Sequence, residues 1–397
     1  MINKTSWTVS SIISMLKEIL EMPRKRMSHS IVTSLIVLLI LFSFVQAPNA
    51  TVGDSFTHFI RVSIQEREET SQIVPHAPIA IDGDINFNAT IQSEGWFGNG
   101  TQSNPYLIEN LLIDLGGISG NCISISNTRA YFIIQNCGLT GASVNTYSGI
   151  YLDNVTNGLL ADNNCWHNDY GIKIEDSSNS TLSNNTCYNN NWYGIWLLRS
   201  GYIGVFGNVC YGTAYGSGIS VELSGTENEI FNNTCFGNNL AGIHISSANS
   251  NKVINNTCMD NHYSGVFIES SDSNLIYNNT IGINTFAGIS CMAGGFNAII
   301  NNTCFNDANG VYIDTSSNSI IINNTLLSHS VGVWLAMFAT SNTVSNNTSS
   351  GSSISIELDS NADNNDVLWN IFEAKYDNAF DDGTSNIFDY NYWSDYT

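Results

Sequence analysis

The sequence has few basic residues. Lys and Arg total 12 of 397 residues, against 34 Asp and Glu, and the formal net charge is −22. Five of the 12 lie before residue 27, so residues 48–397 hold seven basic and 32 acidic side chains. Binding of nucleic acid requires a basic surface that neutralises phosphates. The charge balance therefore argues against nucleic acid and favours solubility, cations or neutral partners.

Proline and lysine are scarce as well, and helical periodicity is missing. The chain has five prolines, and no segment of ten residues in its repetitive part spaces its apolar residues as an amphipathic helix does. Asn, Ser, Thr, Gly and Ile dominate instead, which is the composition of strands and turns. An all-β protein is therefore expected.

Only one apolar run is long enough to concern a membrane. The basic stretch "PRKRMSH" precedes "SIVTSLIVLLILFSFVQA", which ends at Ala47. A basic region followed by an apolar stretch and a small residue predicts a signal peptide over residues 1–47, and an uncleaved anchor helix is the alternative. In both cases the remainder is secreted or at the cell surface, and it contacts a membrane only through residues 31–47 if that segment is retained.

A phrase such as "VINNTCMDNHYSGVFIE" recurs along the chain with a period near 23 residues. The fourth position of its Asn-Asn-Thr-Cys segment is occupied in successive repeats by Cys165, Cys187, Cys210, Cys235, Cys258, Ile281, Cys304, Leu326 and Ser349. A second set of equivalent positions, called a column here, holds a glycine in each repeat from Gly149, Gly171 and Gly194 to Gly332, and Ser353 is predicted to be its next member. Each unit holds two short stretches of period-2 alternation, the signal of strands. Such a unit fits one turn of a parallel β-helix, whose turns stack at about 4.8 Å.

The columns have a physical interpretation. The apolar residues two positions before the Asn pair are expected to point inward as one stack, namely Leu182, Ile230, Val253, Ile276, Ile299, Ile321 and Val344. The glycine marks a close approach or a positive φ. Asn255 and Asn261 are expected in ladders of amides, the second ladder comprising Asn168, Asn190, Asn238, Asn261, Asn284 and Asp307.

These repeats resemble the right-handed parallel β-helix of the NosD-like family, of the carbohydrate-binding and sugar hydrolase type. "GWFGNGTQSNPYLIENLLID" is similar to the first-coil motif of archaeal secreted members, and "NIFDYNYWSDYT" resembles the family's closing phrase. The resemblance covers about residues 79–397 and implies an all-β, right-handed helix of about 11–12 turns. The predicted layout is a polar stalk or cap at 48–78, the β-helix at 79–372 and a C-terminal cap at 373–397.

The nine cysteines show no metal-binding spacing. There is no Cys-x-x-Cys motif, and the Cys column also accepts Ile, Leu and Ser, so buried free thiols are expected. NosD-like relatives are linked to copper-site maturation, but no His or Met cluster accompanies these thiols. No cofactor is predicted, and calcium-assisted action stays open. Asn99 and Asn154 are the preferred glycosylation candidates.

Two outward columns give the sharpest functional signal. In Gly-Ile-x-Ile-x the third residues include Tyr151, Lys173, Trp196, His244, Phe267, Tyr312 and Trp334, and Ser355 is placed next. The fifth residues include Glu175, Glu222, Glu269, Asp314 and Glu357, an acid on every second turn. Aromatic rings beside hydrogen-bond acceptors suit a long sugar chain. The predicted glycan-binding residues are Tyr151, Trp196, His244, Phe267, Tyr312, Trp334, Glu175, Glu222, Glu269 and Asp314.

Two other functions compete with glycan binding on this face. Acids two turns apart lie about 9.6 Å from each other, near the upper end of the range for inverting glycosidases, which makes Glu222 and Glu269 the catalytic pair of a hydrolase or lyase. The motifs of β-helix polygalacturonases and the Arg cluster of pectate lyases are absent. The other alternative is a structural or adhesive solenoid in which the outward rings only stack on one another.

Overall fold

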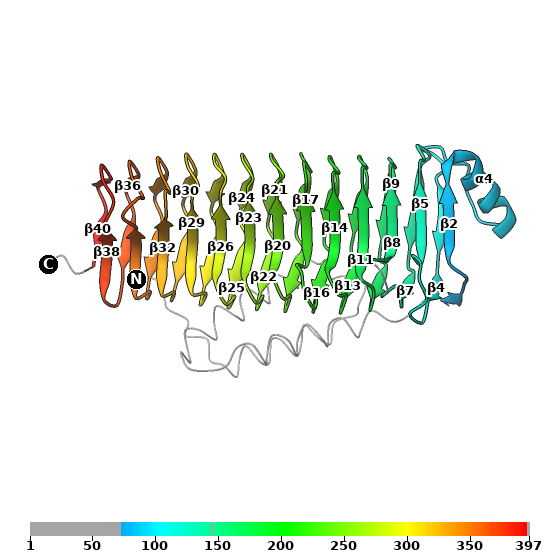
Figure 1. The fold of residues 1–397 in the computed structure, drawn as a ribbon, viewed down its shortest axis with the longest axis horizontal. Coiled ribbons are helices and arrows are strands. Elements are labelled where there is room, and N and C mark those ends of the chain that lie inside the picture. The colour runs from blue at the N-terminus through cyan, green and yellow to red at the C-terminus, as the bar shows by residue number, and fades with distance from the viewer. Residues whose placement is uncertain (1–72, 144–145, 395–397) are drawn as a thin grey trace, which may run out of the picture. The chain divides into compact units, whose positions relative to one another are not determined.

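The computed structural model describes residues 73–143 and 146–394. They form three parallel sheets, named A, B and C here, with 14, 13 and 13 strands. Each strand pairs with the third strand before it and the third after it, so the chain visits sheets B, C and A once in every turn (Figure 1). The predicted all-β, right-handed parallel β-helix is confirmed, with about 12 turns.

The strands are short and regularly spaced. Sheet A contains β1 Val74–Pro75, β4 Leu111–Asp114, β7 Gly138–Thr140, β10 Asn164–Trp166, β13 Thr186–Tyr188, β16 Val209–Tyr211, β19 Thr234–Phe236, β22 Thr257–Met259, β25 Thr280–Gly282, β28 Thr303–Phe305, β31 Thr325–Leu327, β34 Thr348–Ser350, β37 Ile371–Glu373 and β40 Tyr392–Trp393. Sheet B contains β2 Ile79–Asp82, β5 Ile123–Ser126, β8 Ser148–Asp153, β11 Tyr170–Glu175, β14 Tyr193–Leu198, β17 Ile219–Glu222, β20 Ala241–Ser246, β23 Ser264–Glu269, β26 Ala287–Met292, β29 Asn309–Asp314, β32 Val331–Ala336, β35 Ile354–Leu358 and β38 Asp377–Asp381. Sheet C contains β3 Tyr106–Glu109, β6 Phe132–Gln135, β9 Gly158–Ala161, β12 Thr181–Ser183, β15 Gly204–Phe206, β18 Glu229–Phe231, β21 Lys252–Ile254, β24 Leu275–Tyr277, β27 Ala298–Ile300, β30 Ile320–Ile322, β33 Thr343–Ser345, β36 Asp366–Leu368 and β39 Ile387–Asp389.

The core consists of stacks of equivalent side chains. The predicted aliphatic column from Leu182 to Val344 is fully buried, and Ile150 pairs with Ile172 as Ile172 pairs with Ile195 on the next turn. The column glycines are needed for space and not for a positive φ. A Cβ at Gly171 would lie 2.4 Å from the carbonyl oxygen of Gly194, so no side chain fits between these turns.

Amide ladders run through all three corners of the coil. At the corner between sheets C and A the continuous buried ladder runs through Asn256 and not through the predicted Asn255. Asn255 adopts φ 55° at the bend one residue earlier, and its Oδ1 accepts one bond from Asn278 Nδ2 of the next coil. At the corner between A and B the predicted ladder through Asn261 is confirmed. A third ladder, between B and C, was not predicted, and it runs through Asn228, Asn251, Asn274, Asn297, Asn342 and Asn365.

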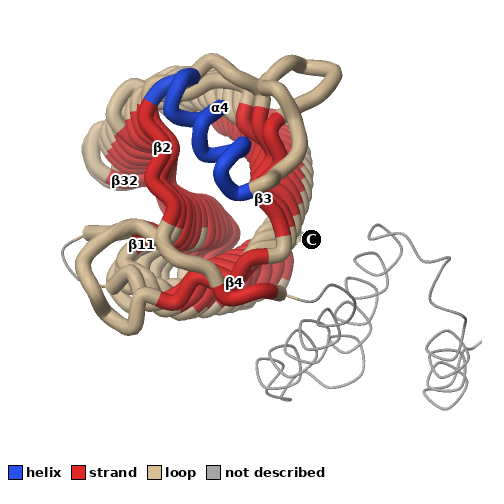
Figure 2. Tube along the Cα trace, turned by 90° about the vertical axis from the view of Figure 1, so that its right-hand side faces the viewer, coloured by secondary structure: helices blue, strands red, loops and turns tan. Residues whose placement is uncertain are grey.

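A helix that the sequence did not predict closes the first turn. The helix α4, Gly83–Glu94, lies across the end of the coil, where Figure 2 shows it between the strands of the first turn. It buries Phe87 and Ile91, and the ring of Phe87 lies 4.5 Å from that of Tyr106 and 5.6 Å from that of Phe132, measured between centroids. This helix shields the apolar interior of the coil from water.

The described coil extends beyond the expected limits of 79 and 372. Strand β1, which lies before residue 79, already pairs with β4. Strands β38, β39 and β40, which lie after residue 372, continue the three sheets. The predicted signal or anchor segment at 1–47, and residues 48–72 of the predicted stalk, lie outside the described residues. Among the described residues no helix has the length and apolar character needed to cross a bilayer.

Candidate functional site

The outer face of sheet B carries the two predicted columns. Strand pairing places Tyr151, Lys173 and Trp196 on successive turns, and then Ser220, His244, Phe267, Ser290, Tyr312 and Trp334. The last step was predicted wrongly. Trp334 pairs with Glu357, and the register that pairs Val333 with Ile356 sets Ser355 beside Gly332. Serines at 353 and 355 both resemble a replacement for the column glycine, and the hydrogen-bonding register selects the second.

A second row of rings flanks the first and was missed by the sequence analysis. It comprises Tyr170, Tyr193, Tyr263 and Phe286, which stand where the chain enters the strands of sheet B. The ring of Trp196 lies 4.9 Å from that of Tyr170 and 5.3 Å from that of Tyr193. The two rows therefore form one aromatic layer. The recurrence of an aromatic residue one or two positions before the column glycine was the available signal.

This packing buries part of the predicted binding row. Phe267 and His244 are each only 6% exposed, and their rings stack at 4.8 Å. Tyr263 contacts Phe267 edge-on at 5.2 Å. Tyr151, Trp196, Tyr312 and Trp334 remain partly exposed. The outward rings thus do stack on one another, as the structural alternative requires, while leaving ring surface open to solvent.

More exposed rings border the same face. Trp192 is 44% exposed and Tyr215 is 63% exposed, and their centroids lie 5.3 Å apart. Trp192 directly precedes β14, and Tyr215 stands in the loop before β17. Neither residue was among the predicted site residues. The two rings pack on each other beside the points where the chain enters sheet B.

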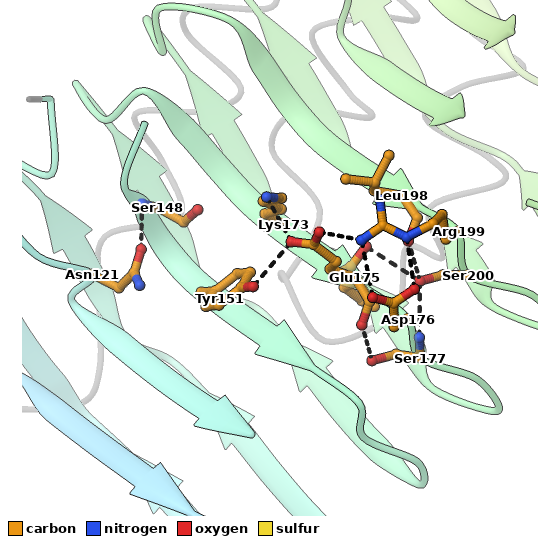
Figure 3. A network of polar contacts seen from close by, with 11 residues as sticks. Asn121, Ser148, Tyr151, Lys173, Glu175, Asp176, Ser177, Leu198, Arg199 and Ser200 are labelled. Atoms are coloured by element: carbon orange, nitrogen blue, oxygen red, sulfur yellow. Dashed lines mark hydrogen bonds and ion pairs between the residues drawn. The ribbon is translucent and has the colours of Figure 1, made fainter. Parts of the chain in front are cut away.

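Glu175 is the centre of an ion-pair network on this face (Figure 3). Its Oε2 lies 2.7 Å from Lys173 Nζ and accepts a hydrogen bond of 2.9 Å from Tyr151 Oη, and its Oε1 accepts one from Arg199. Arg199 also donates to both carboxylate oxygens of Asp176, at 2.8 and 2.9 Å. Burial raises the pKa of Glu175, but the bonds from Lys173, Tyr151 and Arg199 outweigh it and leave the pKa lowered.

The ammonium group of Lys173 is enclosed by rings as well as by the carboxylate. Its Nζ lies 4.7 Å from the ring centroid of Trp196, 5.2 Å from that of Tyr151 and 5.9 Å from that of Tyr170. The faces of aromatic rings attract cations within about 6 Å. This turn therefore binds an amine of the protein itself in a cage of three rings and one carboxylate.

The other predicted acids have fewer partners. Glu222 accepts a hydrogen bond of 2.7 Å from Ser220, and Asp314 accepts one of 3.0 Å from Tyr312. Glu269 lies 3.4 Å from His244 Nε2 and accepts a bond of 3.2 Å from Ser246. Among the described residues no Lys or Arg forms an ion pair with Glu222, Glu269 or Asp314. Asp359, which was not predicted, accepts a bond of 3.0 Å from the indole of Trp334.

Among the described residues, three buried polar atoms on this face have no hydrogen-bond partner. They are Nε1 of Trp196 and both ring nitrogens, Nδ1 and Nε2, of His244. A buried donor without a partner costs about 1–3 kcal/mol, which native structures usually avoid. Both side chains project from the outer face of sheet B, in the row that the sequence predicted to bind a glycan.

The proposed catalytic pair lies two turns apart on this row. Glu222 pairs with Ser246, and Ser246 pairs with Glu269 on the next turn. The approach of His244 lowers the pKa of Glu269, although burial opposes the shift. A general acid that works near neutral pH needs a raised pKa. Hydrolysis by Glu222 and Glu269 stays a prediction that the direction of this shift does not favour.

The cysteines lie in the core and not at this face. All nine are buried and free, and Cys165, Cys187, Cys210, Cys235 and Cys258 occupy successive turns of sheet A. Burial raises the pKa of Cys291 to about 12. The glycosylation candidates Asn99 and Asn154 are both exposed. Asn154 donates a hydrogen bond to Asn127 and accepts one from Arg129.

A comparison with protein families matches the model described as "Periplasmic copper-binding protein (NosD)" over residues 97–286 and 241–397. The chain belongs to the NosD family. No curated protein matches it in sequence. The description names copper, but the described residues contain no group of three or more His, Cys, Asp or Glu placed to hold a metal ion. The stacked thiols are fully buried among aliphatic side chains, so these residues do not fit a copper site.

Solved structures share the fold at low sequence identity. The Dettilon tailspike protein matches with a TM-score of 0.56 and 14% identity over 74% of this chain, which spans 63% of the tailspike. The A-module of the mannuronan C-5 epimerase of Azotobacter vinelandii matches with a TM-score of 0.51 and 13% identity, over 80% of this chain and 90% of that module. These likenesses show the parallel β-helix and nothing finer.

Proposed function

We propose that this NosD-family protein lies outside the cytoplasm and binds a polysaccharide along the outer face of sheet B. The observation that carries the proposal is the aromatic layer, which extends over successive turns with carboxylates at its edge. Pyranose rings have apolar faces and hydroxylated rims, so an extended sugar chain matches rings flanked by acceptors. The unpartnered Trp196 Nε1 is a donor available to a sugar hydroxyl.

Other observations agree with this proposal. The matching family is described as periplasmic, and the predicted signal or anchor segment points to the same side of the membrane. The epimerase module with the same fold acts, by its title, on mannuronan, which is a polysaccharide. The acids on sheet B keep the face hydrated and supply further acceptors for sugar hydroxyls.

Retention on immobilised polysaccharides tests the proposal. We expect Trp196→Ala and Trp334→Ala each to weaken retention by about tenfold, since loss of an aromatic contact at a binding site costs about 1–2 kcal/mol. Tyr277→Ala is the control, because Tyr277 is an exposed ring on the outer face of sheet C. Unchanged retention of both tryptophan variants, or equal losses in the control, would rule out the aromatic layer as the binding surface.

A further inference from the structure

The cage around Lys173 shows how this face binds an amine. One primary ammonium group is held by the carboxylate of Glu175 at 2.7 Å and by the rings of Trp196, Tyr151 and Tyr170. The arrangement combines a charge-assisted hydrogen bond with cation–π contacts. A ligand amine that reaches an equivalent pair of ring and carboxylate would find the same chemistry.

Equivalent pairs recur along sheet B without a lysine. Glu222 lies near Tyr193, whose pKa is raised by burial and by the charge of Glu222. Glu269 stands two residues after the buried Phe267, and Asp314 accepts a hydrogen bond from the hydroxyl of Tyr312. Among the described strands of sheet B, Lys173 is the single Lys or Arg. Three carboxylates are thus displayed near rings without a Lys or Arg paired to them, and His244, 3.4 Å from Glu269, is the one basic side chain recorded beside any of them among the described residues.

The spacing of these acids is regular. Glu175, Glu222, Glu269 and Asp314 occupy every second turn of one column. With turns about 4.8 Å apart, neighbouring acids lie about 9.6 Å from each other. A linear polymer that carries a positive charge at regular intervals can contact several of them at once, which raises its affinity through multivalency.

His244 adds an observation that is independent of the acids. It is 94% buried on the outer face, and its Nδ1 has no hydrogen-bond partner. Its Nε2 lies 3.4 Å from Glu269, which aligns the imidazole with that carboxylate. A buried polar atom without a hydrogen-bond partner, beside an acid that has no Lys or Arg, is a position that a polar ligand would satisfy.

Resting on the proposed function, we propose that the polysaccharide is a polycation built from amino sugars with free amines. Its ammonium groups bind at Glu222, Glu269 and Asp314 as the Lys173 ammonium binds at Glu175, and its ring faces lie on the aromatic layer. A polyuronate does not fit, because its carboxylates would face this acidic column with only Lys173 and Arg199 to attract them, and both are already paired with acids.

Binding of soluble oligosaccharides tests the inference. Titration calorimetry of the full chain compares glucosamine oligomers with N-acetylglucosamine oligomers of equal length, at about pH 6, above the reference pKa values of Asp and Glu and below those of amines. We expect the free-amine oligomers to bind at least about tenfold more tightly, which corresponds to about 1.4 kcal/mol shared among three ion pairs. This comparison needs no variant, so it stands even if a variant fails to fold.

Matched variants locate the binding to the acidic column. The triple variant Glu222→Gln, Glu269→Gln, Asp314→Asn should remove most of the preference for amines. The control Glu227→Gln, Glu229→Gln, Asp366→Asn removes the same number of charges at sheet C and should retain it. Polylysine, which has amines but no sugar rings, reports attraction by net charge alone.

Each outcome decides one point. Equal affinity for the acetylated and free-amine oligomers overturns the amine inference and leaves glycan binding standing. If neither oligomer binds, the inference is overturned, and the proposed glycan binding is then decided by retention on immobilised polysaccharides alone. Equal losses in the two triple variants, or polylysine binding as tight as the glucosamine oligomers, assign the effect to net charge and overturn the proposed site.

Discussion

Asp307 and His329 occupy neighbouring steps of an otherwise amide-rich ladder, with 3.9 Å between Asp307 Oδ2 and His329 Nδ1. Both side chains are buried, and Asp307 Oδ2 has no hydrogen-bond partner. Asp307 Oδ1 accepts bonds from the backbone and side-chain amides of Asn284. Burial raises the pKa of Asp307 to about 8, against the bonds from Asn284, and burial lowers that of His329 to about 4. Near neutral pH both groups are therefore uncharged.

Asp307→Asn should stabilise the protein in alkaline solution. Because the folded pKa of Asp307 lies above the ordinary value of 3.8, the stability that Asp307 contributes is full below that value and is lost as the pH rises through about 8. The folded pKa of His329 is lowered, so the protein loses stability through His329 only as the pH falls below the ordinary value of 6.5. Between pH 6.5 and about 8, the loss of folding stability therefore comes from Asp307 and not from His329.

Urea unfolding at several pH values between about 6.5 and 9 measures this effect. The Asn variant should gain on the order of 2 kcal/mol at the alkaline end, since it removes a buried charge and restores an amide to the ladder. His329→Asn serves as the comparison and should leave the alkaline decline in place. Parallel pH profiles for the wild type and Asp307→Asn would show that Asp307 does not titrate in this range.

Asn256→Ala should destabilise the coil far more than Asn255→Ala. Asn256 Oδ1 accepts bonds from the backbone and side-chain amides of Asn233, and its Nδ2 donates to Ile230 O and Asn279 Oδ1. Truncation leaves buried polar groups unsatisfied and should cost about 2–4 kcal/mol. Truncation of Asn255, which is half-buried and accepts one bond from Asn278, should cost about 1 kcal/mol. Thermal unfolding of the two variants tests the assignment, and equal shifts in Tm would contradict it.

The choice between these adjacent asparagines shows where sequence reasoning stops. Asn favours both positive φ and buried ladders, so an Asn-Asn pair carries no information on which residue does which. The period of about 23 residues was sufficient to predict the coil and its aliphatic core, because every turn repeats the same register. At Ser355 the repeat lost its glycine, and serines at two positions made the register ambiguous.

Two of the features that were missed, helix α4 and the flanking row of rings, depart from the repeat. Helix α4 buries only Phe87 and Ile91, so its sequence lacks a clear apolar stripe. Tyr170 and Tyr193 stand one residue before the column glycine, whereas Tyr263 and Phe286 stand two residues before it. That offset divides the flanking row between two columns of the sequence. Contacts between turns, as between Tyr193 and Trp196, then depend on side-chain direction as well as on register.

Gly171→Ala should be costly although Gly171 does not have a positive φ. Its Cβ would lie 2.4 Å from Gly194 O, 2.9 Å from Asn190 Nδ2 and 3.0 Å from Cys187 Cβ. Overpacking of this kind costs about 1–3 kcal/mol or more, because two turns must separate. Gly116→Ala is the matched control, with φ 56° and no atom within 4 Å of a built Cβ, and it should cost only the left-handed penalty of about 1 kcal/mol. Calorimetric Tm values in the reverse order would contradict the packing explanation.

Glu175→Gln should weaken the fold in a manner that depends on salt and pH. The substitution leaves Lys173 without its carboxylate and removes one of the two acids that Arg199 contacts. Because Arg199 is 42% exposed and solvent screens its pairs, the expected loss is modest, about 1 kcal/mol at low ionic strength. The folded pKa of Glu175 is lowered from 4.5, so its contribution is present above that value and lost as the pH falls through the folded pKa.

The difference in Tm between the wild type and the Glu175→Gln variant should therefore shrink in 1 M salt and vanish in strong acid. Glu229→Gln, which disrupts the exposed pair with Lys252 on sheet C, is the control and should change Tm by less than Glu175→Gln at every pH. A difference in Tm that persists in strong acid would mean that Glu175 acts through packing and not through its charge.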